Sequence, residues 1–160
     1  DNTISVAATL KNKSLASFSN FGSKMVEVAA PGVGILSAYP GDEMGLMSGT
    51  SQAAPYVAGV AGEIKNQNPK LKPSDIKRIL MGTVDGKAWL VGKVASGGVV
   101  NPARAFEAAK LSQTLALELA IEQAKVRVQD QAEVAITGRG FRDDVTPFTA
   151  PGSKEEALVQ

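Results

Sequence analysis

The chain contains no histidine and no cysteine among its 160 residues. Without cysteine it has no disulfide, no thiolate metal site and no cysteine nucleophile. Without histidine it lacks the usual general base at neutral pH and a very common metal ligand. Any chemistry that requires an imidazole must therefore borrow one from outside these residues.

The sequence also has no excess of charge of either sign and no long apolar run. Seventeen basic and sixteen acidic residues give a formal charge of +1, so no global field would recruit nucleic acid or an anionic membrane. No apolar run approaches the length that crosses a bilayer, and residues 1–3 lack the features of a signal peptide. We expect neither a nucleic-acid nor a membrane partner, and 44% hydrophobic residues predict a soluble domain with a real core.

The first third of the chain predicts short strands. Residues 2–10 are rich in strand-forming residues, and residues 25–29 form a second short apolar run that a Pro-Gly turn closes. Residues 35–39 predict a third strand, which ends at the Pro-Gly-Asp turn of residues 40–42.

Helices are expected in the middle of the chain. Small and apolar residues at spacings of three and four predict a helix over residues 51–65 that is buried on much of its surface. A second helix is expected from residue 72 to about 82, with Pro73 near its start and Asp75 in its first turn. Asn101, followed by proline, predicts the N-cap of a third helix.

The C-terminal part of the sequence is less decisive. Residues 115–121 alternate like a strand but have the composition of a helix, so both interpretations stay open. From residue 129 onward the chain is polar and holds several turn signals, which predict a mobile tail or linker with at most a hairpin.

The stretch 48–59 reads SGTSQAAPYVAG and is the most informative one. It places Ser51 at the start of the predicted helix, directly after a Gly-Thr turn. Unpaired N–H groups and the positive helix end stabilise negative charge there, so the Ser51 N–H is a candidate oxyanion donor. Small residues such as Gly49 let a substrate backbone come close. The alternative for an isolated Gly-Thr-Ser is a Ser or Thr N-cap on a buried helix.

The longer pattern, GTSxAxPxVAG, closely resembles the nucleophile signature of the subtilisin family of serine proteases. Residues 4–8, 15–22 and 28–35 resemble the strands and loops that precede the serine helix in that family, and residues 98–103 resemble its closing strand-to-helix step. The resemblance covers about residues 2–112. It implies an α/β fold in which this chain is the C-terminal part of a mainly parallel sheet flanked by helices.

The same resemblance implies the activity and the domain organisation. Residues 1–112 would be the C-terminal part of a catalytic domain, and residues 113–160 a C-terminal extension that is partly polar or mobile. Family members are usually secreted serine endopeptidases that hydrolyse peptide bonds through an acyl-enzyme, here on Ser51. Protein or peptide substrates are therefore expected.

Two members of the catalytic triad are missing. The family uses Asp, His and Ser in that chain order, and Ser51 alone matches here. The oxyanion Asn cited for subtilisin should also precede this chain. We therefore expect an upstream segment or chain of the same protease to supply these groups, with a break before Asp1 that autoproteolysis would produce; a truncated product is the alternative. Bare strand edges predict poor folding of the chain by itself.

Other site residues follow from the resemblance. Ser48, Gly49 and Met47 would line the substrate's approach to the nucleophile, although Met47 is equally compatible with simple packing. No metal or other cofactor is expected. In some relatives an acid at the position of Glu27 helps to bind a cation, so a structural calcium was considered, but a solvated surface acid is the simpler interpretation.

Two further positions depart from the family pattern. Gln52 stands where the family often has methionine, so peroxide should not inactivate the site through a thioether there. Tyr56 stands where a structural histidine is common, which affects packing and not catalysis.

Two other functions remain open at this point. A catalytically dead subtilisin-like scaffold would act as a binding or structural module, and Asp and His in the upstream sequence would distinguish it from an active protease. Alternatively, this is a released fragment whose tail interacts with a partner, with residues 137–141 opening a further β-module.

Overall fold

The computed structural model describes residues 2–129, and its centre is a four-stranded sheet. The strands are β1 (Val6–Thr9), β2 (Val28–Pro31), β5 (Asp85–Gly86) and β6 (Gly98–Val99), in the order β1-β2-β6-β5. β1, β2 and β6 run parallel, while β5 is antiparallel to β6. The α/β fold with a mainly parallel sheet is confirmed.

In β1 and β2, alanines allow neighbouring elements to pack closely on both faces of the sheet. Ala8 and Ala30 are fully buried in the cluster that includes α1 (Thr50–Gln67). Ala7 and Ala29 pack on the opposite face with Leu90, Val94 and Val99. Strands covered on both faces read as continuous apolar runs without alternation, which explains the short apolar segments of the sequence.

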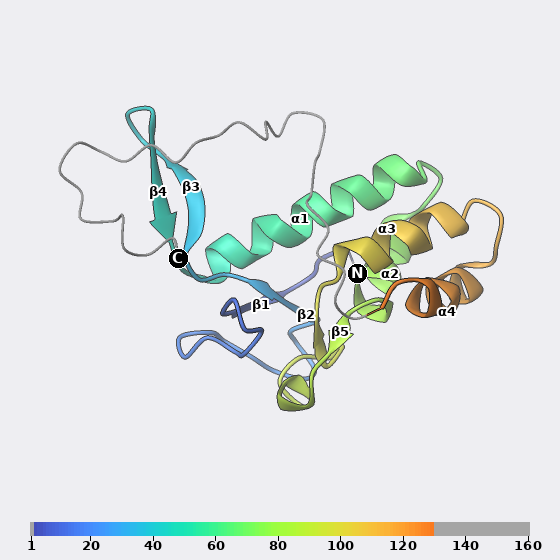
Figure 1. Ribbon diagram of the computed structural model, residues 1–160, viewed down its shortest axis with the longest axis horizontal. Helices are drawn as coiled ribbons and strands as arrows, with labels where there is room; N and C mark the ends of the chain where they lie inside the picture. Colours follow the sequence, from blue (N-terminus) through green and yellow to red (C-terminus); the bar gives the residue numbers. More distant parts are fainter. Residues whose placement is uncertain (1, 130–160) are drawn as a thin grey trace.

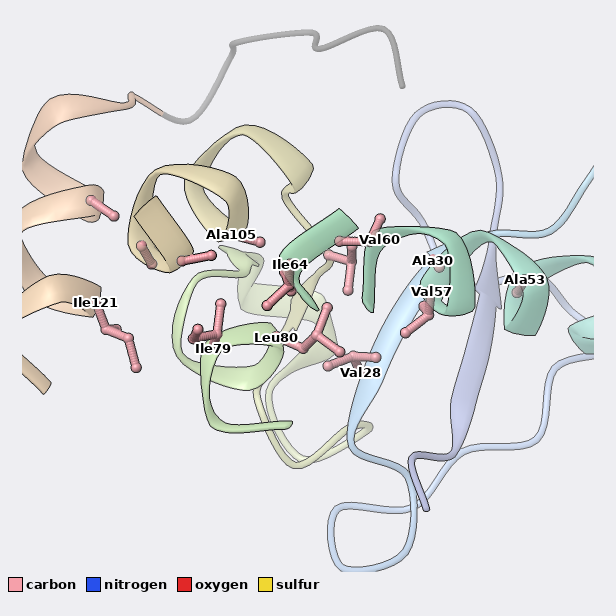
Figure 2. Close-up of a cluster of buried hydrophobic side chains, with 14 of the residues drawn as sticks. Val28, Ala30, Ala53, Val57, Val60, Ile64, Ile79, Leu80, Ala105 and Ile121 are labelled. Carbon is pink, nitrogen blue, oxygen red and sulfur yellow. The ribbon is translucent and has the colours of Figure 1, made fainter. Parts of the chain in front are cut away.

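Within residues 2–129, four helices accompany the sheet, and Figure 1 shows their arrangement. They are α1, α2 (Pro73–Gly82), α3 (Pro102–Leu111) and α4 (Leu117–Arg127), and a short 3₁₀ turn, η1 (Ala88–Leu90), precedes β6. Figure 2 shows the main core, where side chains from β2 and all four helices meet. Its labelled members are Val28, Ala30, Ala53, Val57, Val60, Ile64, Ile79, Leu80, Ala105 and Ile121.

The predicted helix starts are confirmed. The Asn101 side chain accepts a hydrogen bond from the Arg104 N–H at 3.1 Å, which makes it the N-cap of α3. α2 begins at Pro73, and Asp75 Oδ2 accepts from the Lys72 N–H at 3.0 Å. Both helices therefore have proline where a missing N–H costs nothing.

A second sheet consists of a single hairpin. β3 (Ile35–Tyr39) and β4 (Glu43–Met47) pair antiparallel and project away from the main sheet and helices (Figure 1). The turn between them has Gly41 at φ 88° and Asp42 at φ 59°. The predicted strand 35–39 and its turn are confirmed, but the return strand β4 was not expected, because Glu43 and Gly45 are poor strand formers.

Several boundaries differ from the prediction. The second strand begins at Val28 and not at residue 25, because residues 22–26 form a turn in which the Val26 N–H bonds to the Gly22 carbonyl at 2.9 Å. The ambiguous stretch after residue 115 is helical, and α4 packs against α3. The proposed boundary at residue 112 stays a prediction, and the expectations for residues 130–160 lie outside the described residues.

No helix within residues 2–129 combines the length and the apolar character needed to span a bilayer.

Candidate active site

Ser51 is the second residue of α1 and is exposed at the helix N-terminus. The N-cap of α1 is Gly49, and no side chain caps the helix. The Ser or Thr N-cap considered from the sequence is therefore not formed. Within residues 2–129, no hydrogen bond is recorded for the Ser51 hydroxyl or for its N–H. The hydroxyl thus has no structural task in this part of the chain.

The segment before the helix is held at two points. The Gly49 N–H donates to the Gly32 carbonyl at 2.7 Å, and the Gly34 N–H donates to Ser48 Oγ at 2.9 Å. These bonds tie the end of the hairpin to the residues that follow β2. Ser51 is therefore presented by a fixed backbone at the carboxyl end of the sheet, although its own side chain is free.

The electrostatics of the helix start favour an anion. α1 has no acidic residue in its first turn, so nothing there neutralises the positive end of the helix dipole. The Gly49 carbonyl accepts from the N–H groups of Gln52 and Ala53 at 3.1 and 3.2 Å. The Ser51 N–H lacks an acceptor among the described residues and is available for a developing oxyanion.

The structure places the three predicted substrate contacts next to Ser51. Met47 ends β4, is 38% exposed, and its sulfur accepts from Gln52 Nε2 at 3.6 Å. An added Cβ at Gly49 would lie 2.8 Å from Gln52 Oε1, so a larger residue would displace that side chain. Ser48 is also exposed, with its hydroxyl engaged by Gly34.

No residue of the described chain supplies a base to Ser51. Lys65 donates to the carbonyls of Pro69 and Leu71 at 2.7 and 2.8 Å. It lies fourteen positions along α1 from Ser51, which is about 21 Å of helix. Neither Lys65 nor Lys24 makes a recorded hydrogen bond to Ser51 within residues 2–129.

Gly32 is a positioning residue that the sequence analysis treated only as part of a turn. An added Cβ would lie 2.7 Å from Ala8 Cβ and 2.8 Å from the Gly49 carbonyl oxygen. The helix start therefore sits directly on β1 and β2. The Pro31-Gly32 pair was visible in the sequence, but the close approach depends on residues far away in the chain.

Glu27 is not the solvated acid that was expected. Its side chain is 16% exposed, Lys77 Nζ lies 2.7 Å from Oε1, and the Ser5 N–H donates to Oε2 at 2.6 Å. Burial favours the neutral carboxyl, but the hydrogen bond and charge of Lys77 and the N–H of Ser5 outweigh it, so the pKa of Glu27 is lowered from 4.5. With both oxygens engaged, Glu27 does not fit a cation site. Within residues 2–129 no group of three potential metal ligands is present.

Tyr56 lies half-buried on the second turn of α1 and packs against the main core. Burial raises the pKa of its hydroxyl above 10.0, so it is neutral at physiological pH. The position that often carries a structural histidine is therefore filled by an apolar ring with a polar tip, which is a packing role.

A family model described as the subtilase family, Peptidase_S8, matches residues 1–134. The chain belongs to the subtilase family. Thermitase from Thermoactinomyces vulgaris is 43% identical over 98 residues, which is 58% of this chain and 34% of thermitase. Subtilisin DY from Bacillus licheniformis is 39% identical over 103 residues, which is 63% of this chain and 36% of that protein.

Solved subtilase structures agree with the fold. The A-subunit of the AB5 toxin from E. coli has a TM-score of 0.61 at 33% identity, covering 67% of this chain and 38% of that one. The structure described as proteases from Pseudoalteromonas arctica has a TM-score of 0.59 at 35% identity, and the match covers 68% of this chain and 36% of that one. The chain spans between 22% and 36% of the first curated relatives it matches, so it corresponds to one part of a subtilase.

Proposed function

We propose that this chain is the nucleophile-bearing part of a serine endopeptidase and that Ser51 forms the acyl-enzyme. The observation that carries this proposal is the free, exposed hydroxyl of Ser51 at an uncapped helix N-terminus within a subtilase sequence. A serine with a structural role would cap the helix or bond to a neighbour; Ser51 does neither among residues 2–129.

In the proposed reaction, Ser51 Oγ attacks the scissile carbonyl carbon while a histidine from the upstream part of the protease takes its proton. An upstream aspartate orients that histidine. The Ser51 N–H, with an upstream asparagine, holds the oxyanion. The C–N bond then breaks as the histidine protonates the leaving amine. Water, deprotonated by the same histidine, hydrolyses the ester and regenerates the serine.

Substrate would approach along the end of β4. Met47 and Gly49 lie in the segment that leads from β4 to Ser51 at the start of α1. Exposed Met47 offers an apolar contact to a substrate side chain. We therefore assign Met47, Ser48 and Gly49 to substrate binding, while the main specificity pocket belongs to the upstream part.

The outer surface of α1 supports an upstream partner. The residues opposite its buried side are small and exposed; they are Ala54, Pro55, Ala58, Gly59 and Gly62. A helix face that stays in water is normally polar and charged, whereas small residues allow another backbone to pack closely. β1 also lies at the open end of the sheet order. The small exposed face of α1 and the open edge of β1 are therefore both surfaces on which an upstream part of the protease could pack.

The setting of the protease is part of the same proposal. One relative is the cell wall-associated protease of Bacillus subtilis, 44% identical over 82 residues, which is 51% of this chain and 9% of that protein. We propose an extracellular, secreted enzyme that undergoes autoproteolysis.

A fluorophosphonate probe tests the function directly. The protease assembled with its upstream part should be labelled at Ser51 and lose activity in proportion, because a neighbouring histidine activates the hydroxyl. The chain by itself should stay unlabelled, because it contains no histidine. Rapid labelling of the isolated chain would show that another base serves Ser51. An assembled protein that resists labelling would instead be a catalytically dead scaffold.

A further inference from the structure

A methionine sulfur lies within hydrogen-bonding distance of the residue that follows Ser51. Met47 is the last residue of β4, and its Sδ accepts from Gln52 Nε2 at 3.6 Å. An added Cβ at Gly49 would lie 2.8 Å from Gln52 Oε1. The carboxamide of Gln52 therefore lies between Gly49 and the thioether of Met47, at the same helix start as Ser51.

The backbone on both sides of this contact is fixed. Met47 pairs with Ile35 in the hairpin. The Gln52 N–H donates to the Gly49 carbonyl at 3.1 Å, and the Gly49 N–H donates to the Gly32 carbonyl at 2.7 Å. A change in the size or polarity of the Met47 side chain therefore acts on the Gln52 carboxamide and on the approach to Ser51, and a shift of the backbone does not absorb it.

The thioether is a group that peroxide modifies. Its sulfur attacks one oxygen of hydrogen peroxide, so that an S–O bond forms as the O–O bond breaks. The sulfur is oxidised by two electrons, and the proton of the transferred oxygen passes to the departing oxygen, which leaves as water. The product is a sulfoxide, a polar and chiral group, whereas the thioether is apolar and only a weak hydrogen-bond acceptor.

We propose that Met47 is an oxidation site that controls substrate binding by the assembled protease. The inference rests on the proposed function, in which exposed Met47 offers an apolar contact to a substrate side chain. The sulfoxide oxygen is a stronger acceptor for Gln52 Nε2, and a bound substrate would have to desolvate this oxygen, which is unfavourable. Oxidation should therefore raise KM more than it lowers kcat, because the hydroxyl and the N–H of Ser51 are unchanged.

The other three of the four methionines have different surroundings. Met25 is 77% exposed and lies in the turn that precedes β2. Met44 shares β4 with Met47 but lies three positions away, so the two side chains leave opposite faces of the hairpin. Met81 is partly buried against the main core. Met25 and Met44 are therefore matched controls, the first for exposure and the second for position on the same strand.

Treatment of the assembled protease with hydrogen peroxide tests the proposal. After treatment, KM for a peptide substrate should rise while the fluorophosphonate probe still labels Ser51, and mass spectrometry should find one added oxygen on Met47. Each variant is compared with its own untreated sample. Met47→Leu should keep its KM, whereas KM should rise in Met25→Leu and Met44→Leu as in the parent. Methionine sulfoxide reductases specific for the two epimers, with a dithiol as reductant, should reverse the change.

The probe separates this inference from the proposed function. A protein that the probe does not label before treatment would contradict the proposed function. A labelled enzyme whose KM stays constant after full conversion of Met47 would instead overturn the oxidation site. A rise in KM of Met47→Leu equal to that of the parent would also overturn it.

The side-chain amide of Gln52 gives a readout that does not require activity. Its NMR signals, assigned by their loss in Gln52→Glu, should move downfield when the parent or Met44→Leu is oxidised, because the sulfoxide oxygen accepts a stronger hydrogen bond. The signals should stay in place in Met47→Leu. Unchanged signals in a parent sample with oxidised Met47 would show that the modification does not reach Gln52, and the proposal would be wrong.

Discussion

At the start of α1, two serines three residues apart make different contacts. Ser48 Oγ accepts a hydrogen bond from the Gly34 N–H, whereas the Ser51 hydroxyl has no partner among residues 2–129. The first side chain thus contributes to stability, and the second is available for chemistry. This difference separates the two roles experimentally.

Replacing each serine by alanine should give opposite results. Ser51→Ala should abolish peptide hydrolysis by the assembled enzyme and change the free energy of unfolding by less than about 0.5 kcal/mol, since no contact is lost. Ser48→Ala should lower that free energy by about 1 kcal/mol and leave measurable activity. Chemical denaturation and a peptide-cleavage assay measure both quantities. If the Ser51→Ala variant kept nearly the parental activity, Ser51 would not be the nucleophile.

Glu27 makes stability depend on acid pH. Its pKa is lowered in the folded chain, so its contribution is complete above the unfolded value near 4.5 and disappears as the pH falls through the folded value. Glu27→Gln should destabilise by about 1 to 3 kcal/mol at pH 7 and by much less at pH 3. Urea unfolding at the two pH values measures this.

Glu118 is the matched control for that experiment. It pairs with Arg78 at the surface, where the two side chains are 70% and 52% exposed. Glu118→Gln should therefore change the free energy of unfolding by less than about 1 kcal/mol at either pH. If the two variants behave alike, the hydrogen bonds that Glu27 accepts from Lys77 and Ser5 do not contribute measurably to stability.

At the scale of the helices and strands, α1 packs on β1 and β2 at Gly32, and this contact leaves little room for a larger side chain. Gly32→Ala should lower the free energy of unfolding by about 1 to 3 kcal/mol and reduce activity, because the added methyl group meets Ala8 and the Gly49 carbonyl. Gly22→Ala is the control, since its added Cβ would meet no atom within 4 Å. Thermal unfolding compares them, and equal midpoints would show that the junction can relax.

The helices could be predicted more fully than the strands. Asn101 and Pro73 mark their helix starts through local capping chemistry, which a sequence displays directly. The two-residue strands β5 and β6 are too short to give a local pattern, and β6 is defined by its pairing with the distant β2. β4 pairs with the neighbouring β3, but Glu43 and Gly45 hide its strand character. α4 was ambiguous because its spacing fits a strand while its composition favours a helix.

The site could be predicted only in part for the same reason. Ser51 was singled out as the candidate nucleophile because its motif is contiguous in the sequence. The contacts that position it, from Gly32 and Gly34, join residues far apart in the chain. The Glu27–Lys77 pair spans fifty positions, and nothing in the sequence distinguishes that acid from an exposed one.

The molecule as a whole corresponds to roughly a third of the subtilisin-type relatives it matches. In the proposed enzyme, the small exposed residues of α1 are an interface with the upstream part. Ala58→Glu should therefore leave the chain's own secondary structure intact but weaken association with the upstream part by at least about tenfold, because a buried unpaired carboxylate is costly.

Val126→Glu is the control for that prediction, since Val126 on α4 is 81% exposed and far from the small face of α1 in sequence. Co-purification and titration calorimetry measure the association, and circular dichroism checks the fold. Equal affinity of both variants would place the upstream part elsewhere.

The hairpin of β3 and β4 is closed at its base by the Gly34–Ser48 and Gly32–Gly49 hydrogen bonds. The residues between Gly34 and Ser48 therefore form a separate hairpin, and a change in its length does not move Ser51. Doubling the length of such a loop costs only about 0.6 kcal/mol. Insertions at the turn of residues 40–42 should therefore lengthen the hairpin without shifting the backbone of Ser51.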